Sequence, residues 1–481
     1  MSQFKGYYDD KNGIGYSQGM NNELSEKARL HQQQQPVKLQ PAWEENNLPD
    51  DELNFRHLTM AEASLALHEP RDRNKFIYIT FLVHGIGVLT SWNMFINAFE
   101  YFRFYKFSVE YIGFSFDYNS NFMQYLTFCS QIPAIVFSWV NVFLQLGGNI
   151  TVRIVWSIGV AIVVFIVTIL LAMLDTSEIP YAFFYVTLVC VVILNSANAI
   201  YQNTIFGMAA KLPGKYTGAI VIGNNICGLF ASSVSSISKL SASNLKMAAI
   251  YYFITALFVL LICFDTYFAL PLNKYYRHFD LKEKKEKQKA LASSTGGRPP
   301  YWYIFRKALP QLLNVYLVFF VTLSIFPTIQ TGITKSDPGF FVSEDFYSEI
   351  MCFMTFNLFA LIGSWLPSYF IWPGPKWLWI PVVLRLVYIP LFLLCNYNVE
   401  GVDRVLPIVI QNDYVYFYLS ATMALSSGYL SSLAMMYVPS AVEERYATTA
   451  GMFAAAALAS GIFSGIVMTF GWPWFISHVG N

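Results

Sequence analysis

From Phe76 onward the chain consists of long apolar stretches separated by short polar ones. Eleven of these stretches are long enough to cross a bilayer, because a helix rises about 1.5 Å per residue and needs about 20 apolar residues to span the hydrocarbon core. The pattern predicts membrane helices at 75–103, 120–146, 151–174, 180–209, 216–238, 246–271, 309–333, 349–371, 377–396, 413–438 and 446–471. The predicted fold class is an all-α polytopic membrane protein.

A basic stretch at 272–308 divides the predicted helices into six and five. It contains ten basic residues, opposed only by Asp280, Glu283 and Glu286. Positive charge next to membrane helices stays in the cytosol, so six preceding helices place the N-terminus there as well, and eleven leave the C-terminus outside. The stretch is either a solvated tether between two bundles or a segment that docks on anionic lipid or carries regulation.

This division gives the expected organisation of the chain. The parts are a disordered cytosolic tail (1–72), an N-terminal bundle (75–271), a basic cytosolic loop (272–308), a C-terminal bundle (309–471) and an extracellular tail (472–481). The tail is expected to be disordered because it is too polar to bury a core.

Composition removes several function classes. Of the 481 residues, 55% are hydrophobic and only 13% are charged, against about 25% charged in soluble domains. The net charge of +1 gives no reason to expect a nucleic acid partner. The six cysteines lie in or beside apolar stretches, as packing residues do. Because HExxH, phosphate-loop and nucleophile-elbow motifs are missing, we expect neither an enzyme nor a cofactor or metal.

Polar side chains inside the apolar stretches are the candidates for function, since each needs a partner or a water-filled cavity. Trp92 lies mid-helix, and Asn195, Asn198 and Gln202 share one helical face. A single such residue more often joins two helices than it contacts a ligand. Their presence on several helices, with few carboxylates, favours a passage for a neutral solute over an ion pump. Arg385 must face protein or reach the interface, and its partner cannot be identified from the sequence.

Several short motifs follow one another along these helices. They are Gly85-Ile-Gly-Val-Leu-Thr-Ser-Trp92-Asn93, Asn195-Ser196 with Gln202 and Phe206-Gly207, Phe326-Pro327, Thr355-Phe-Asn357, Trp372-Pro373-Gly374, Arg385, Ser427-Gly428-Tyr429 and Thr449-Ala450-Gly451. In this order, with the long loop after the sixth helix, the chain resembles the equilibrative nucleoside transporter family, solute carrier family 29, over most of 75–471.

The resemblance implies a fold like that of the major facilitator superfamily, with helices arranged six plus five. It also implies facilitative, bidirectional nucleoside transport by alternating access, with one site between the bundles. The substrate-binding positions that it implies are Trp92, Gln131, Asn198, Gln202, Phe326, Asn357 and Ser364.

The chain departs from the family on its eighth helix, where many members carry an aspartate and an arginine that help to hold the ribose. Ala360 and Ser364 stand at those two positions. Nucleobases or another neutral metabolite are therefore an alternative cargo, and a sensor that binds without transporting is an alternative function. The remaining expectations are a monomer in the plasma membrane, whose partners are the lipid bilayer and a nucleoside-like substrate.

Overall fold

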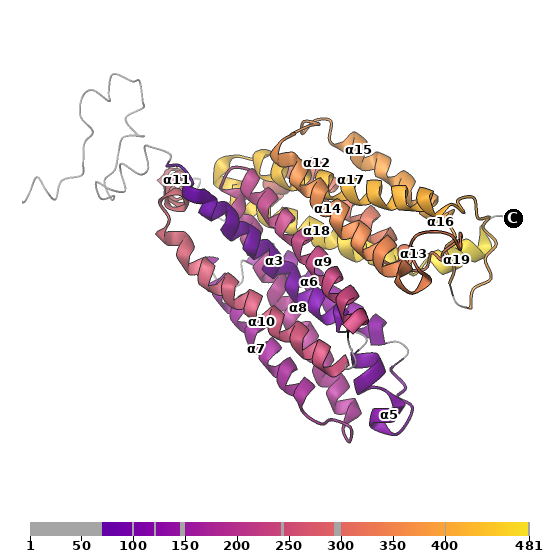
Figure 1. The fold of residues 1–481 in the computed structure, drawn as a ribbon. Coiled ribbons are helices and arrows are strands. Elements are labelled where there is room, and N and C mark those ends of the chain that lie inside the picture. The colour runs from indigo at the N-terminus through magenta and orange to yellow at the C-terminus, as the bar shows by residue number, and fades with distance from the viewer. Residues whose placement is uncertain are drawn as a thin grey trace, which may run out of the picture. The chain divides into compact units, whose positions relative to one another are not determined.

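The structure is a computed structural model that describes residues 70–98, 101–119, 122–144, 150–241, 245–292, 300–399 and 401–479. Apart from two isolated β-bridges, these residues form helices and the connections between them (Figure 1). The longer helices are α3 (Phe76–Asn97), α6 (Phe122–Leu144), α7 (Ile150–Met173), α8 (Pro180–Ala210), α9 (Lys215–Ser241), α10 (Leu245–Ala269), α11 (Lys274–Ala292), α12 (Tyr301–Ile325), α14 (Thr355–Trp365), α17 (Asp413–Ser440) and α18 (Ala447–Thr469).

Shorter helical turns extend or connect these elements. They are η2 (Arg73–Lys75), η3 (Phe102–Lys106), α5 (Val109–Ile112), η4 (Leu270–Leu272), α13 (Thr328–Thr331), η5 (Glu344–Phe346), η6 (Glu349–Met354), η7 (Leu366–Ser368), α15 (Trp379–Leu384), η8 (Arg385–Val387), α16 (Tyr388–Leu393), η9 (Glu444–Tyr446) and α19 (Trp472–His478). Proline and capping residues explain several boundaries. Pro180 begins α8, where its missing N–H costs nothing, and the Asn412 side chain accepts two backbone N–H groups at the start of α17.

Each predicted membrane stretch contains a helix in the structure. Eight helices of the described chain are long and apolar enough to cross a membrane. The exceptions are α9 and α17, which are rich in serine and glycine, and the shorter apolar segment Trp379–Leu393. The all-α fold is confirmed, and the count of eleven crossings stays a prediction. The first helix ends at Asn97, six residues before the predicted end, and the seventh begins at Tyr301, eight residues before the predicted start.

Part of the basic stretch is not a solvated tether. The nineteen residues of α11 form a helix, and Tyr275, Tyr276 and His278 on it are buried. The ring of Tyr275 lies 5.5 Å from that of Tyr216 at the start of α9. The helix is therefore docked against the helices that precede it.

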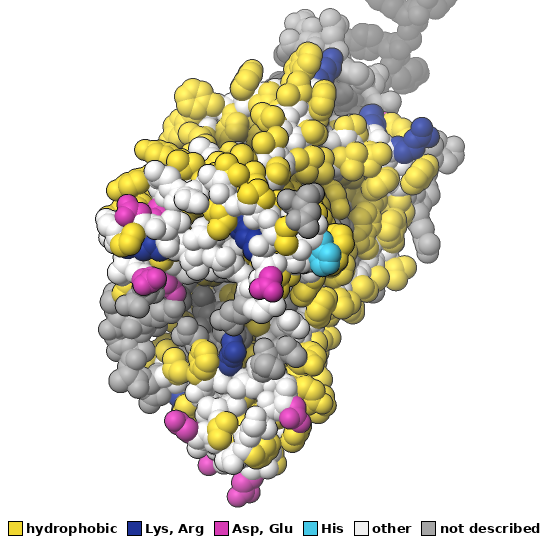
Figure 2. Space-filling model, turned by 90° about the vertical axis from the view of Figure 1, so that its right-hand side faces the viewer, with side chains coloured by type: hydrophobic (Ala, Val, Ile, Leu, Met, Phe, Trp, Pro, Cys, Tyr) yellow, Lys and Arg dark blue, Asp and Glu magenta, His cyan; other side chains and the backbone are white. Residues whose placement is uncertain are grey.

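The helices form two bundles, an N-terminal one (α3 and α6–α10) and a C-terminal one (α12–α18). One continuous apolar core joins both bundles at the end that carries α11, where it includes Phe206, Leu433 and Phe453. At the opposite end the C-terminal bundle has a separate core around Ile329, Tyr416 and other residues. We refer to the shared end as the basic end. Figure 2 views the opposite end, where apolar side chains cover the flanks.

Glycines allow close crossings inside each bundle. In the N-terminal bundle, a Cβ on Gly85 would collide with the carbonyl oxygen of Ile220 on α9. In the C-terminal bundle, a Cβ on Gly428 would collide with the carbonyl oxygen of Ala360 on α14. Helix backbones that approach this closely leave no room for a methyl group, as in many membrane helix pairs. These crossings fix α3 on α9 and α14 on α17.

The connection between α14 and α15 exposes a row of aromatic side chains. Trp372 and Trp377 lie in this connection and Trp379 begins α15, and all three side chains are more than half exposed. The backbone of this connection is bound to α17 and α12. The hydroxyl of Tyr437 donates to the carbonyl of Pro373, and the side-chain amide of Gln311 donates to the carbonyl of Pro375. Exposed tryptophans are typical of the boundary between membrane and water.

Candidate functional site

The four candidate residues of the N-terminal bundle come from three helices. Trp92 lies on α3, Gln131 on α6, and Asn198 and Gln202 on α8, and all four are half-buried. The neighbouring helices α6 and α8 are joined by a hydrogen bond from the Asn203 amide to the Ser138 carbonyl. The two helices run in the same direction, because α7 reverses the chain between them, so this bond places Gln131 near the level of Asn195 and Ser196.

The asparagines and glutamines of α8 fall into two groups. Asn195 is buried and donates to the carbonyl of Val191, and Asn203 is buried and donates to α6. In the described part of the chain, the amides of Asn198 and Gln202 form no hydrogen bond. Since a polar group in an apolar surrounding needs a partner, these two amides are the ones available to a solute. The sequence placed Asn195, Asn198 and Gln202 on one face and could not make this distinction.

A break in the seventh helix presents Phe326. The helix α12 ends at Ile325, Phe326 has an extended backbone, and Pro327 follows. A residue before proline avoids the helical conformation, and proline lacks the N–H that would continue the ladder. The half-buried ring of Phe326 stacks on Phe356 of α14, with centroids 3.9 Å apart, and meets Phe353 edge-on at 5.7 Å. The result is an aromatic surface on the C-terminal bundle.

Helix α9 connects the first predicted helix to the eighth. The amide of Asn93, next to Trp92, lies 3.3 Å from the sulfur of Cys227. The neighbouring Gly228 is so close to Asn357 of α14 that a Cβ on it would collide with the Asn357 side-chain oxygen. Asn357 is buried and also donates to the carbonyl of Phe353. One turn of α9 thus touches a neighbour of Trp92 on one side and Asn357 on the other.

Ser364 has a different surrounding from the other candidates. It is 1% exposed, and its hydroxyl donates to the carbonyl of Leu361. Its backbone and that of Ala360, 2% exposed, pack against Gly428 of α17. The two positions where the chain departs from the family pattern are therefore part of a helix crossing, and a substrate contact at Ser364 stays a prediction.

Arg385 faces protein, and its partners lie on two other helices. Its guanidinium donates to the carbonyl of Val318 at 2.9 Å and the hydroxyl of Thr322 at 3.0 Å on α12, and to the carbonyl of Met423 at 3.2 Å on α17. Among the described residues, no carboxylate forms an ion pair with it. Arg385 holds three segments of the C-terminal bundle together and is not placed to bind a solute.

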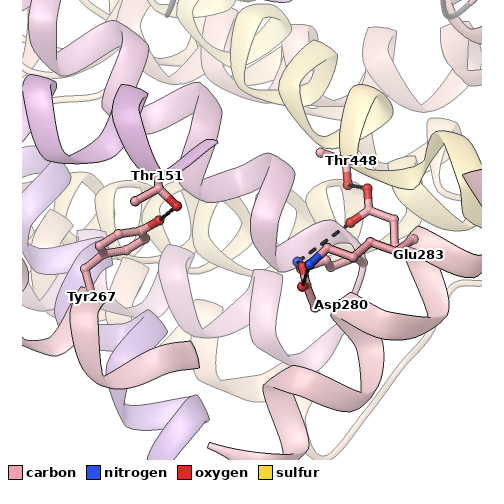
Figure 3. Close-up of polar contacts among 7 residues, drawn as sticks. Thr151, Tyr267, Asp280, Glu283 and Thr448 are labelled. Carbon is pink, nitrogen blue, oxygen red and sulfur yellow. Dashed lines mark hydrogen bonds and ion pairs between the residues drawn. The ribbon is translucent and has the colours of Figure 1, made fainter. Parts of the chain in front are cut away.

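The basic end carries a polar cluster that the sequence analysis did not identify. The ammonium of Lys211, at the end of α8, lies 2.7 Å from Asp280 and 3.7 Å from Glu283, both on α11. Glu283 also accepts a hydrogen bond of 2.8 Å from the hydroxyl of Thr448 on α18. In Figure 3, Glu283 extends from the pink α11 toward Thr448 on the yellow α18. The three-residue spacing of Asp280 and Glu283 puts both on one face of a helix, which was the available signal.

The surroundings keep this cluster ionised. Burial alone would lower the pKa of Lys211, but Tyr276 and the carboxylates of Glu283 and Asp280 outweigh it and raise that pKa. Burial would raise the pKa of Asp280, but Lys211 and Lys284 outweigh it and lower that pKa. The cation also lies at the C-terminus of α8, where the helix dipole favours positive charge. Lys211 and Asp280 therefore stay oppositely charged at neutral pH.

A cavity of about 440 Å³ adjoins this cluster. Both bundles and α11 contribute to its lining, through Lys211, Thr217, Glu283, Met436, Ser440 and Glu444 among other residues. Thr217 is 2% exposed, and its hydroxyl has no hydrogen-bond partner in the structure.

Sequence comparison relates this chain to known proteins. A family model described as nucleoside transporter matches residues 188–474. Equilibrative nucleoside transporter 1 of Homo sapiens is 31% identical over 84% of this chain and 98% of its own length. Equilibrative nucleoside transporter 2 of Homo sapiens is 30% identical over 83% of this chain and 97% of its own length.

Among solved structures, the proton:xylose symporter XylE of the major facilitator superfamily superposes with a TM-score of 0.56 at 12% identity. The match covers 85% of this chain and 97% of that one. At this identity the likeness shows the fold, and it agrees with the expected arrangement of two bundles. The family model and the human relatives together show that this chain belongs to the equilibrative nucleoside transporter family.

Proposed function

We propose that the protein is a facilitative carrier that moves nucleosides across a membrane in both directions by alternating access. Its relatives are equilibrative nucleoside transporters, and its fold is that of a two-bundle carrier. The observation that carries the proposal is the pair of unbonded amides of Asn198 and Gln202 together with the half-buried rings of Trp92 and Phe326. A nucleoside offers a flat base for such rings and polar edges and hydroxyls for such amides.

The proposed site lies between the bundles and is formed by Trp92, Gln131, Asn198, Gln202, Phe326, Asn357 and Ser364. The contact of α9 with α14 supports it, because that contact brings the first and eighth helices together around Cys227 and Gly228. Asn357 is mostly buried and part of its hydrogen-bonding capacity is used inside α14, so we assign it the smaller share of the binding.

We propose that the basic end is cytosolic and that the membrane is the plasma membrane. Lys211, Lys215, Lys282, Lys284 and Arg445 support this orientation, because they gather near this end and positive charge stays in the cytosol. The N-terminus is then cytosolic and the C-terminus extracellular, and the carrier acts as a monomer. The predicted tail at 1–72 lies almost wholly outside the described residues.

Flux measurements in proteoliposomes test the transport function. Purified protein should give saturable uptake of tritiated adenosine and uridine, and preloaded vesicles should show the reverse flux. Imposing a pH gradient should leave the final distribution of substrate unchanged, since the carrier is not coupled to protons. No saturable flux in either direction would remove the proposal, and binding without flux would indicate a sensor.

A second cargo class follows from the eighth helix. Ala360 and Ser364 pack tightly against α17 and offer no charge to a ribose. A carrier that relies on the base alone would accept free nucleobases. Competition of adenosine uptake by adenine, uracil and their nucleosides decides between the two. Equal inhibition by base and nucleoside would favour nucleobase transport.

A further inference from the structure

The helix α11 is tied to the N-terminal bundle at two places. The rings of Tyr275 and Tyr216 are in contact, and Asp280 pairs with Lys211. The side chain of Lys211 is 3% exposed and that of Asp280 is 31% exposed, so water and salt screen this ion pair only in part. These contacts stay within one bundle and its attached helix.

Two other contacts of α11 cross to the C-terminal bundle. The hydroxyl of Thr448, in the first turn of α18, donates a hydrogen bond of 2.8 Å to the carboxylate of Glu283. The ammonium of Lys282 lies 2.8 Å from the carboxylate of Glu444 of η9. The side chains of Lys282 and Glu444 are 49% and 71% exposed, so their ion pair adds little to the stability of the contact between α11 and the C-terminal bundle. Glu283 is 8% exposed, and its hydrogen bond to Thr448 is charge-assisted, which makes it the stronger of the two crossing contacts.

The bundles also touch directly at this end. A Cβ on Gly451 of α18 would lie 2.7 Å from the carbonyl oxygen of Phe206 on α8. The side chain of Met436 on α17 packs over Gly214 and Gly218 at the start of α9. Together with the shared apolar core, these contacts show that the basic end is closed. Alternating access requires that it open.

We propose that Glu283 is a gating residue of the transport cycle, which holds the basic end closed by joining Lys211 of the N-terminal bundle to Thr448 of the C-terminal bundle. This inference rests on the proposed carrier function. When the end opens, the contacts of Glu283 with Thr448 and of Lys282 with Glu444 break, whereas Lys211 keeps Asp280. The helix α11 is then the moving part of the gate, and Thr217, which is buried in the wall of the cavity, becomes exposed to the solvent.

A buried thiol at Thr217 reports the opening. Thr217 lines the cavity, is 2% exposed, and loses no hydrogen bond when it is replaced by cysteine. The background is Cys129→Ser, because Cys129 is half-buried while the other five cysteines are buried. The measured quantity is the rate at which a charged methanethiosulfonate reagent modifies T217C in purified, detergent-solubilised protein.

The decisive variant is Thr448→Val, which removes the donor and keeps the shape of the side chain. Loss of one charge-assisted hydrogen bond should raise the modification rate about tenfold. Glu283→Ala should raise it at least as much, and Thr448→Ser should keep the parent rate because its hydroxyl is retained. Lys284→Ala is the matched control, since Lys284 pairs with Asp280 inside α11 and does not reach the other bundle.

Unchanged rates in Thr448→Val and Glu283→Ala would overturn the proposal. An equal rise at Cys352, a buried native thiol near the opposite end, would also overturn it, because the variant would then have loosened the whole fold. The assay needs no knowledge of the cargo. If the parent protein shows no nucleoside flux but Thr448→Val still raises the modification rate of T217C, the gating role of Glu283 is supported and nucleoside transport is not.

Discussion

Two buried cations in this protein are held in opposite ways. Lys211 lies at the junction of the bundles and pairs with the carboxylates of Asp280 and Glu283 on α11. Arg385 lies inside the C-terminal bundle and donates to two backbone carbonyls and a threonine hydroxyl. A carboxylate at the end of a side chain can exchange partners during a cycle, whereas carbonyls within a helix cannot move away separately. The comparison teaches that Arg385 joins segments of one bundle, whereas Lys211 anchors α11, whose Glu283 also reaches the other bundle.

The largest expected effect comes from Arg385. Arg385→Ala removes hydrogen bonds to α12 and α17 and leaves a cavity, so it should lower the free energy of unfolding by about 2–4 kcal/mol. The measurement is the apparent melting temperature of purified protein. Lys284→Ala, at an exposed position of α11, should leave that temperature unchanged. An unchanged melting temperature for Arg385→Ala would show that Arg385 does not hold the bundle together.

Substitutions at two glycines compare a contact within one bundle with a contact between the bundles. Gly363→Ala would force a methyl group against the carbonyl of Leu425 within the C-terminal bundle and should destabilise the protein by about 1–3 kcal/mol. Gly451→Ala introduces the same group between the bundles, against Phe206. It should raise the thiol reactivity of T217C with a smaller loss of melting temperature. Equal effects of the two variants on both measurements would contradict the distinction.

Two side-chain amides of α8 compare a residue without a hydrogen bond in the structure with one that joins two helices. Gln202→Ala should lower uptake about tenfold at unchanged surface level, because Gln202 has no hydrogen bond in the structure and one bond to a substrate is worth about 1–1.5 kcal/mol. Asn203→Ala, one residue on, should instead lower the surface level, since Asn203 joins α8 to α6. Uptake normalised to surface protein separates the two. A loss of expression in Gln202→Ala would mark Gln202 as a structural residue.

The smallest expected effect is that of pH on the Lys211–Asp280 pair. The lowered pKa of Asp280 means that the pair stabilises the docked position of α11 fully above the ordinary aspartate value of about 4, and this stabilisation is lost only as pH falls through the folded pKa. The raised pKa of Lys211 keeps it charged below the ordinary lysine value of about 10.4. The modification rate of T217C, corrected for the titration of a free thiol, should therefore be constant between pH 6 and 8. A rise within this range would contradict the assigned charge states.

The sequence predicted the helices well because length and hydropathy decide them. Even α9 and α17, which are rich in serine and glycine, were placed within a few residues. The docked state of α11 was missed because its partner Lys211 precedes Asp280 by 69 residues and no local pattern connects them. Charge counting alone could not distinguish a solvated helix from one that carries a buried ion pair.

The candidate site was predictable in its residue types but not in their surroundings. Periodicity placed Asn195 beside Asn198, yet only the structure shows that Asn195 is bonded within its own helix. The partners of Arg385 are mainly carbonyls, which every residue has and which leave no trace in a sequence. The burial of Ser364 follows from Gly428 on another helix, a contact that no motif encodes.

The cavity beside Glu283 has a pharmacological consequence. A compound that filled its roughly 440 Å³ would touch both bundles and hold them together at that end. It would stop the carrier without contacting Trp92, Gln202 or the cargo itself, so added substrate would not relieve the inhibition. Its selectivity among related carriers would depend on Thr217, Met436 and Glu444, and not on the residues that choose what is carried.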